Sequence, residues 1–126
     1  MRVPGGSTHV RGDVLVVDDE SSLRLLCRVN LELEGYHVRE AGSLAAARAE
    51  VEREPPDLVL LDVHVGADDG LELLDTIEAL ELPVRVVLLS GTSEVGPALR
   101  ARVDGVLGKP FELESLTAAV RSLIVR

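Results

Sequence analysis

Short runs of leucine and β-branched residues recur along the chain, and segments with helical periodicity separate them. The clearest runs are VLVV (14–17), LVLL (58–61) and VRVVLL (84–89), each bounded by charged residues or proline. Continuous apolar runs of this length are typical of strands buried on both faces, as parallel sheets require. YHVREA (36–41) and GVL (105–107) are weaker members of the same set. We therefore expect five strands.

The segments between these runs carry apolar residues at helical spacing. The inward-facing residues that we expect of the four clear helices are Leu23, Leu26 and Leu33; Leu44, Ala47 and Val51; Leu73, Leu74, Ile77 and Leu80; and Leu113, Leu116, Val120, Leu123 and Ile124. Residues 93–101 contain Gly96 and Pro97, which leave room for about two turns of helix. The fourth helix is therefore expected to be short or irregular.

Five alternations of strand and helix predict an α/β fold with a doubly wound five-stranded parallel sheet and helices on both faces. The length of 126 residues suits one domain. Pro, Gly and polar residues dominate the first dozen positions, so we expect residues 1–12 to form a flexible lead-in and residues 13–126 to form the domain.

The composition excludes several classes of protein. A net charge of −9 argues against non-specific nucleic-acid binding, which needs clustered Lys and Arg. The single cysteine, Cys27, excludes an intrachain disulfide and most cysteine-based metal sites, and its leucine-rich surroundings favour a buried, inert thiol. No apolar run approaches the length of about 18 residues that a membrane helix needs, and the N-terminus lacks the apolar core of a secretory signal. We therefore expect a cytoplasmic protein.

Polar residues follow the expected strands where each strand ends. The first strand leads into Asp18 and Asp19, the third into Asp62, the fourth into Ser90 and the fifth into Lys109. The carboxyl ends of parallel strands share one edge of the sheet, where ligands bind in open α/β folds. Two carboxylates about 4 Å apart repel by roughly 4 kcal/mol at an effective dielectric near 20. A hard cation such as Mg²⁺ relieves that repulsion.

Lys109 is the only lysine among 13 basic residues. A slim ammonium on a flexible stem fits a crowded phosphate site beside a metal ion better than the broad guanidinium of arginine does. Taken singly, an Asp pair, a serine or a lysine after a strand is typical of solvated loops and caps. Their occurrence on successive strand ends favours a functional site.

The segments VLVVDDE, DLVLLD with a following Gly70, VVLLS and GKPF resemble the receiver domain of two-component response regulators. The resemblance spans about residues 13–125. It implies a flavodoxin-like sheet with strand order 2-1-3-4-5. It also implies a phosphorelay partner, either a sensor histidine kinase or a phosphotransfer protein, while the downstream partner or output domain stays unknown.

The resemblance assigns Asp62 as the phosphoacceptor, whose carboxylate attacks phosphorus to form an acyl phosphate. It implies that Asp19 and Asp62 bind Mg²⁺ directly and that Asp18 helps largely through water. The backbone carbonyl of His64 completes the implied metal ligands.

For the phosphoryl group, the resemblance implies a hydrogen bond from Ser90 and a contact from Lys109, which first pairs with Asp62. It also implies a cis peptide bond between Lys109 and Pro110.

Three features depart from the family pattern. Val106 stands three residues before Lys109, where the family usually has an aromatic residue that moves with the hydroxyl. The stretch from Ser90 to Lys109 is about three residues shorter than usual, and Gly66 replaces a common proline, leaving GADDG as a flexible acidic loop. The first two changes fall on the surface through which receivers often dimerise or signal. We therefore expect a phosphorylation-competent receiver with an atypical output face, and a homodimer is one expected assembly.

Two alternatives stay open from the sequence. The fold could serve as a phosphorylation-independent interaction domain, which the altered output face favours and the complete acidic site opposes. Phosphotransferases and phosphatases of the dehalogenase type also use a strand-end aspartate, but they want a second Asp where this chain has His64. The main prediction is a signalling module with Mg²⁺-dependent self-phosphorylation and self-dephosphorylation, and no enzyme acting on a separate substrate.

Overall fold

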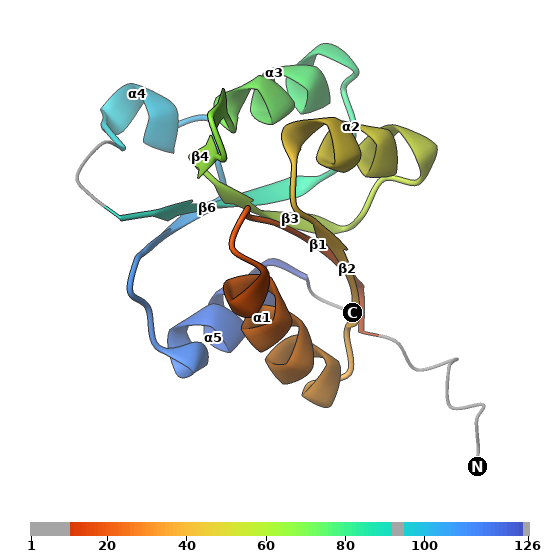
Figure 1. Ribbon diagram of the computed structural model, residues 1–126, viewed down its shortest axis with the longest axis vertical. Coiled ribbons are helices and arrows are strands. Elements are labelled where there is room, and N and C mark those ends of the chain that lie inside the picture. Colours follow the sequence, from red (N-terminus) through yellow and green to blue (C-terminus); the bar gives the residue numbers. More distant parts are fainter. Residues whose placement is uncertain (1–10, 92–94, 125–126) are drawn as a thin grey trace.

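The computed structural model describes residues 11–91 and 95–124. Residues 1–10 of the predicted lead-in lie outside the described residues. A five-stranded parallel sheet is covered on both faces by helices (Figure 1). The strands of this sheet are β1 (Asp13–Val17), β2 (His37–Ala41), β3 (Leu58–Asp62), β6 (Arg85–Ser90) and β7 (Gly105–Gly108).

The strands lie in the order β2-β1-β3-β6-β7. This is the predicted order 2-1-3-4-5, since β4 (His64–Val65) and β5 (Asp68–Asp69) form a separate antiparallel pair. One face carries α1 (Ser21–Leu33) and α5 (Leu113–Leu123), and the other carries α2 (Leu44–Arg53), α3 (Leu71–Ala79) and α4 (Pro97–Arg100) (Figure 1). The predicted doubly wound α/β architecture is confirmed.

Alternation along the strands divides the core into two layers, because successive side chains of a strand point to opposite faces. Leu15 and Val59 pack with the buried residues of α2 and α3. Val16 and Leu60 pack with the buried residues of α1 and α5. The apolar side chains of the three central strands, β1, β3 and β6, are buried, so the sheet is a rigid platform for the residues that follow its carboxyl ends.

The inner face of α1 differs from the prediction. Leu26 is 46% exposed and Leu33 is 79% exposed, whereas Cys27 and Leu31 are fully buried. The helix carries apolar residues around most of its circumference, so periodicity alone could not select the face that packs on the sheet. The thiol of Cys27 is buried as predicted, and burial followed by the charge of Asp18 raises its pKa to about 11. Such a thiol is inert at neutral pH.

A second helix also ends differently from the prediction. Leu73, Leu74 and Ile77 of α3 are buried as expected, but Leu80 is 52% exposed. It follows the last residue of the helix as its C-cap, where the chain turns away from the core. Among the described residues, no helix is long and apolar enough to cross a membrane.

The fourth helix is short, as the sequence predicts, and shorter than the about two turns for which the sequence left room. Residues 93 and 94 of the expected segment lie outside the described residues. α4 has four residues, begins with Pro97 at its first position and contributes no fully buried side chain. Val106 on β7 is half-buried and packs at the edge of the core layer beneath α2, α3 and α4. This side of the sheet therefore has a thin covering near β7.

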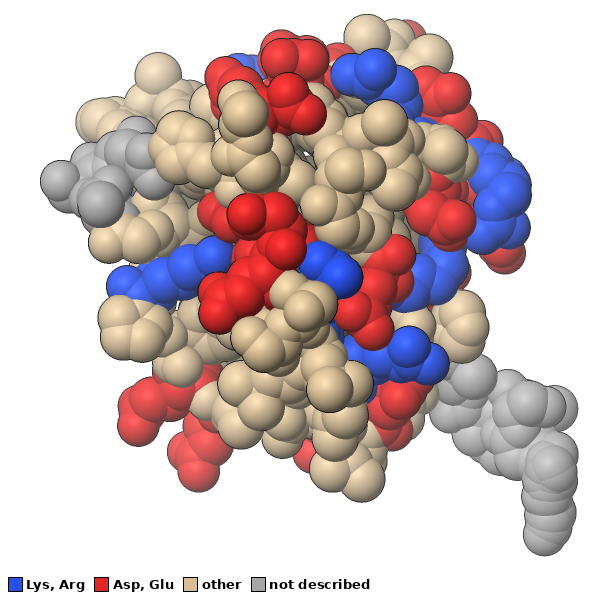
Figure 2. Space-filling view, viewed as in Figure 1, with Lys and Arg blue, Asp and Glu red and all other residues tan. Residues whose placement is uncertain are grey.

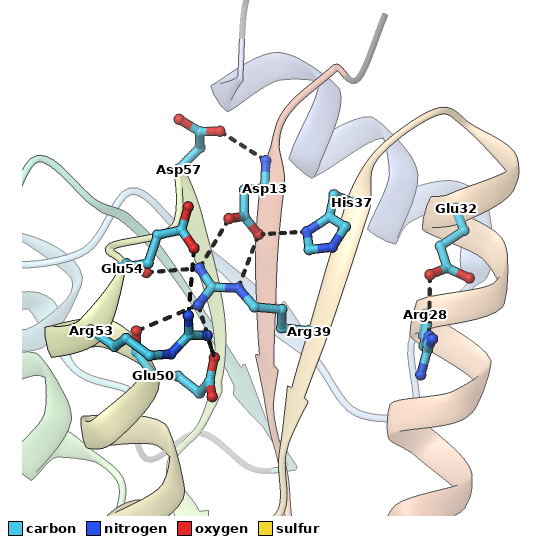
Figure 3. A network of polar contacts seen from close by, with 9 residues as sticks. All are labelled: Asp13, Arg28, Glu32, His37, Arg39, Glu50, Arg53, Glu54 and Asp57. Atoms are coloured by element: carbon cyan, nitrogen blue, oxygen red, sulfur yellow. Dashed lines mark hydrogen bonds and ion pairs between the residues drawn. The ribbon is translucent and has the colours of Figure 1, made fainter. Parts of the chain in front are cut away.

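A network of charged side chains fixes the amino-terminal end of the sheet (Figure 3). The guanidinium of Arg39 on β2 donates hydrogen bonds to Asp13 at 3.0 Å, to the Glu50 carboxylate at 2.9 Å and to the Glu54 carbonyl at 2.8 Å. Burial pushes the pKa of Arg39 down, but hydrogen bonds to Asp13 and Glu50 outweigh it and raise the pKa. These contacts tie β1, β2 and the end of α2 together, far from the carboxyl ends of the strands.

The acidic loop after β3 is more ordered than the sequence suggested. β4 and β5 pair His64 with Asp69 and Val65 with Asp68, so residues 66 and 67 form a two-residue turn. Gly66 has a φ of +64°, a left-handed conformation that glycine favours and that the fixed φ of proline does not permit. The hairpin gives a physical reason for glycine in place of the family's proline.

Candidate functional site

The predicted site residues meet at the carboxyl edge of the sheet. Asp18 directly follows β1, Asp62 and Ser90 end β3 and β6, and Lys109 directly follows β7. Parallel pairing of Ser90 with Gly108 brings the end of β6 beside Lys109. Acidic side chains gather near the middle of the face shown in Figure 2, at the level of the sheet.

Three carboxylates form the centre of the site. One oxygen each of Asp18, Asp19 and Asp62 lies within 4.8 Å of the other two. Asp18 is buried, Asp62 is partly buried and Asp19 is exposed. Hard carboxylate oxygens in such a group are the donors that Mg²⁺ prefers, and an exposed member leaves room for water ligands. The residues present therefore fit a magnesium ion.

Lys109 joins two of these carboxylates. Its Nζ lies 2.7 Å from Asp18 Oδ2 and 3.1 Å from Asp62 Oδ2. The expected contact with Asp62 is present, and the shorter contact with Asp18 was not foreseen from the sequence. The peptide bond between Lys109 and Pro110 is cis, as the resemblance implied. The backbone N–H of Lys109 also donates to the Ser90 carbonyl at 2.6 Å, which holds the lysine against the end of β6.

The electrostatics of the cluster show crowded negative charge. Burial raises the pKa of Asp62, and the charge of Asp18 adds to this, while hydrogen bonds from Lys109 and His64 act in the opposite direction. Burial lowers the pKa of Lys109, but hydrogen bonds to Asp18 and Asp62 outweigh burial and raise it. The lysine is therefore firmly protonated, and one ammonium does not fully offset the neighbouring acids.

Local backbone bonds orient the acidic side chains. The N–H of Glu20 donates to Asp18 Oδ1 at 2.9 Å, and the N–H of His64 donates to Asp62 Oδ1 at 3.3 Å. Both carboxylates therefore accept one bond from the following loop and one from Lys109. His64 lies at the start of the hairpin beside the site, and the metal role of its backbone carbonyl stays a prediction.

Gly70 is required by a close approach of the backbone. A Cβ added at this position would overlap the carbonyl oxygen of Asp62 and press on that of Val63. The Gly70 N–H donates to the Val63 carbonyl at 2.7 Å. The glycine thus closes the hairpin loop tightly onto the backbone at the end of β3. The sequence spacing marked this glycine without showing its reason.

A largely apolar groove of about 390 Å³ borders the site on the α1 side. The lining residues are Glu20, Leu23, Leu26, Lys109, Pro110 and Phe111. The surface over α1 beneath the acidic cluster consists mainly of uncharged side chains in Figure 2. Leu26 is the exposed leucine that the sequence placed in the core, and here it forms one wall of the groove. The groove ends at the lysine that contacts Asp62.

The sequence that builds this site matches a known family. A family model described as the response regulator receiver domain matches residues 14–121. The chain belongs to the receiver domain family. It is therefore a receiver domain of two-component response regulators, and aspartate phosphorylation is the function of that family.

Several curated relatives align over most of this receiver domain. Sporulation initiation phosphotransferase F of Bacillus subtilis is 30% identical over 114 residues, which cover 88% of this chain and 92% of the relative. The alginate biosynthesis transcriptional regulatory protein AlgB of Pseudomonas aeruginosa is 38% identical over 124 residues, or 95% of this chain and 28% of the relative. Other curated relatives that the chain matches are longer than the sporulation phosphotransferase, and the chain spans between 24% and 52% of their length.

Solved structures of receiver domains have the same fold. The signal receiver domain of a LuxO repressor protein from Vibrio parahaemolyticus superposes with a TM-score of 0.84 at 25% identity, covering 91% of both chains. The receiver domain of NtrX from Brucella abortus gives a TM-score of 0.81 at 32% identity, covering 89% of this chain and 98% of the other.

Proposed function

We propose that Asp62 accepts a phosphoryl group from a sensor histidine kinase or a phosphotransfer protein. An Asp62 carboxylate oxygen attacks phosphorus, a new P–O bond forms, and the P–N bond to the donor histidine breaks as its electron pair returns to the imidazole. The phosphoryl group ends on Asp62 of the chain itself, so the chain is not an enzyme with a separate substrate. Since such donors are charged from ATP, the reaction belongs in the cytoplasm.

The observation that carries this proposal is the position of Lys109 Nζ between Asp18 and Asp62, at 2.7 Å and 3.1 Å. An ammonium there neutralises an incoming phosphoryl oxygen. Asp18, Asp19 and Asp62 would hold Mg²⁺ together with the His64 carbonyl, and the bound ion would offset the charge that develops on the phosphoryl oxygens. The three carboxylate oxygens lie close enough together for one ion to span them.

Ser90 supports the step that follows phosphorylation. It is 2% exposed at the carboxyl end of β6, one strand away from Asp62. We infer that its hydroxyl donates a hydrogen bond to the phosphoryl group and so couples the modification to the segment that follows β6. Adding charge and acceptor oxygens at such a site is a common way to bias a switch.

The output of this switch is expected to be atypical. α4 is a single turn without a fully buried side chain, and half-buried Val106 has no aromatic ring that could move inward when the Ser90 hydroxyl moves. Amide chemical shifts with and without Mg²⁺ and beryllofluoride, a phosphoryl mimic, test this inference. Shift changes spread beyond residues 95–124 are expected. Large changes confined to that segment would contradict it.

The groove beside Lys109 supports a protein donor. A phosphorylated histidine must reach Asp62 from outside, so its carrier must rest on the surface around the site. Exposed Leu25, Leu26 and Val29 on α1 and the apolar groove provide such a surface. We infer that the donor packs an apolar helix face there.

Phosphorylation is tested with acetyl phosphate and Mg²⁺, followed by intact mass. The wild type should gain one phosphoryl group, and it should not do so in EDTA. Asp62→Asn should gain none, whereas Asp68→Asn, a matched change at an exposed hairpin acid, should gain as much as the wild type.

An unlabelled wild type, under conditions that label another receiver domain, would contradict the proposal. That result would favour the second candidate, a constitutive interaction domain. The short α4 and the half-buried Val106 are the observations that favour this alternative.

A further inference from the structure

We propose that Arg24 is a positioning residue that holds the turn carrying Asp18 and Asp19 in the shape that binds Mg²⁺. The inference rests on the proposed function, because it concerns the same cation site. Arg24 lies in the first half of α1, and its Nη1 donates to the backbone carbonyl of Asp18 at 2.6 Å. Its Nε donates to Glu40 Oε1 on β2 at 3.1 Å. One side chain thus links an edge strand, a helix and the metal-site loop.

The guanidinium is held in place from several directions. The Arg24 side chain is 17% exposed and its Glu40 partner is 22% exposed. The other carboxylate oxygen of Glu40 accepts a bond from the more exposed Arg28 at 3.2 Å. A Cβ added at Gly42 would lie 2.9 Å from Arg24 Nη1 and 3.2 Å from Cζ, so the backbone at Gly42 packs against the guanidinium. Arg24 has little freedom to leave Asp18.

The bond to the Asp18 carbonyl matters because that carbonyl belongs to the peptide unit that leads to Asp19. On the other side of Asp18, its N–H donates to the Ala41 carbonyl at 3.2 Å. The Asp18 side chain accepts bonds from Glu20 N–H at 2.9 Å and from Lys109 at 2.7 Å. Arg24 therefore supplies the bond that fixes the rotation of the Asp18–Asp19 peptide. That rotation sets the direction of the exposed Asp19 carboxylate.

The sign of the expected effect separates positioning from simple electrostatics. Arg24 is a positive charge beside a proposed cation site, so its charge alone opposes Mg²⁺ binding. Removing that charge would strengthen binding if the loop kept its shape. Weaker binding after removal can only come from the lost geometry. Loss of a residue that hydrogen-bonds to the metal-binding residues typically lowers metal affinity by roughly 10–100-fold.

Arg28 provides a matched control. It contacts the same Glu40 and pairs with Glu32 four residues along α1. Within the part of the chain that the structure describes, its guanidinium bonds to these two acids and not to the Asp18–Asp19 turn. Arg24→Met and Arg28→Met remove the same charge from the same helix. We expect Arg24→Met to weaken Mg²⁺ binding about tenfold, and Arg28→Met to leave it within about twofold because exposed charges are screened. Isothermal titration of the full chain with MgCl₂ measures both.

A second readout works without metal or phosphoryl transfer. The Glu20 amide donates to the Asp18 carboxylate, so its hydrogen-exchange rate in EDTA reports the shape of the turn. Exchange should be faster in Arg24→Met than in the wild type and unchanged in Arg28→Met. Gly42→Ala keeps the charge but presses on the guanidinium, and it should weaken Mg²⁺ binding in the same direction. If Arg24→Met fails to fold, Gly42→Ala and Arg24→Lys take its place in the measurements of Mg²⁺ affinity and Glu20 exchange.

The outcomes distinguish the two proposals. Equal Mg²⁺ affinity and equal Glu20 exchange in the wild type and Arg24→Met would overturn the positioning role alone. Tighter Mg²⁺ binding by Arg24→Met would also overturn it and would show that only charge matters. A wild type that binds no Mg²⁺ would contradict the proposed function and this inference with it.

Discussion

Replacing Asp62 by asparagine should stabilise the metal-free protein. Asp62 has an oxygen within 4.8 Å of oxygens of Asp18 and Asp19, and at an effective dielectric near 20 each contact costs about 3.5 kcal/mol. The attraction between Asp62 and Lys109 at 3.1 Å stabilises the folded state by about 5 kcal/mol at the same effective dielectric. The two repulsions exceed the attraction by about 2 kcal/mol. Burial of Asp62 also disfavours its charged form. We expect Asp62→Asn to raise the free energy of unfolding by about 1–2 kcal/mol.

Urea unfolding in EDTA and in Mg²⁺ measures this effect. In EDTA the variant should be the more stable protein. In saturating Mg²⁺ the difference should shrink or reverse, because the wild type gains the binding free energy of the ion and the variant lacks one carboxylate ligand. Asp68→Asn is the control, since Asp68 is exposed at the hairpin and lies outside the cluster of close carboxylates. It should show neither effect.

The pH dependence follows from the raised pKa of Asp62. The folded state keeps the Asp62 proton to a higher pH than the unfolded state does, so wild-type stability falls as pH rises from the ordinary range of Asp to that raised pKa. The advantage of Asp62→Asn should be absent below the ordinary range and complete above the raised pKa. An Asp62→Asn protein less stable than the wild type in EDTA at neutral pH would refute the electrostatic reasoning.

Three further predictions concern other residues. Lys109→Arg should still gain a phosphoryl group by intact mass but should lose the accompanying amide shift changes; intact shift changes would contradict the role of a slim ammonium. Gly70→Ala should cost about 2 kcal/mol in urea unfolding, because its Cβ meets the Asp62 carbonyl; a neutral change would contradict the close approach. Arg39→Ala should cost about 2 kcal/mol through its buried ionic hydrogen bonds, while exposed Arg53→Ala, which removes a contact to the same Glu50, should cost at most about 1 kcal/mol. Equal losses would contradict the weight given to burial.

The site was predictable because strand ends fix where side chains gather. Runs of buried strand residues located the ends of β1, β3, β6 and β7, and parallel pairing then required Asp18, Asp62, Ser90 and Lys109 to meet. Pro97 and the short spacing before Lys109 predicted a short α4 for a similarly local reason. These inferences depend on where the strands end, which local sequence patterns show, and on the strand order, which the resemblance to receiver domains implied.

Other features depend on contacts that no local pattern reveals. α1 is apolar around most of its surface, so the choice of Cys27 and Leu31 as core residues depends on how the helix docks. The hairpin after β3 depends on pairing His64 with Asp69 inside a segment that looks like an acidic loop. The contacts of Lys109 with Asp18 and of Arg24 with the Asp18 carbonyl join residues whose distances follow only from the folded loops.

A crystal structure with Mg²⁺ and beryllofluoride tests the central claim most directly. The account predicts the beryllium atom on an Asp62 carboxylate oxygen and Mg²⁺ on the cluster of Asp18, Asp19 and Asp62. It also predicts contacts from Lys109 Nζ and the Ser90 hydroxyl to the fluorine atoms. Beryllofluoride bound elsewhere, or Mg²⁺ absent from the three carboxylates while Lys109 stays paired with Asp62, would contradict the claim that this site accepts a phosphoryl group.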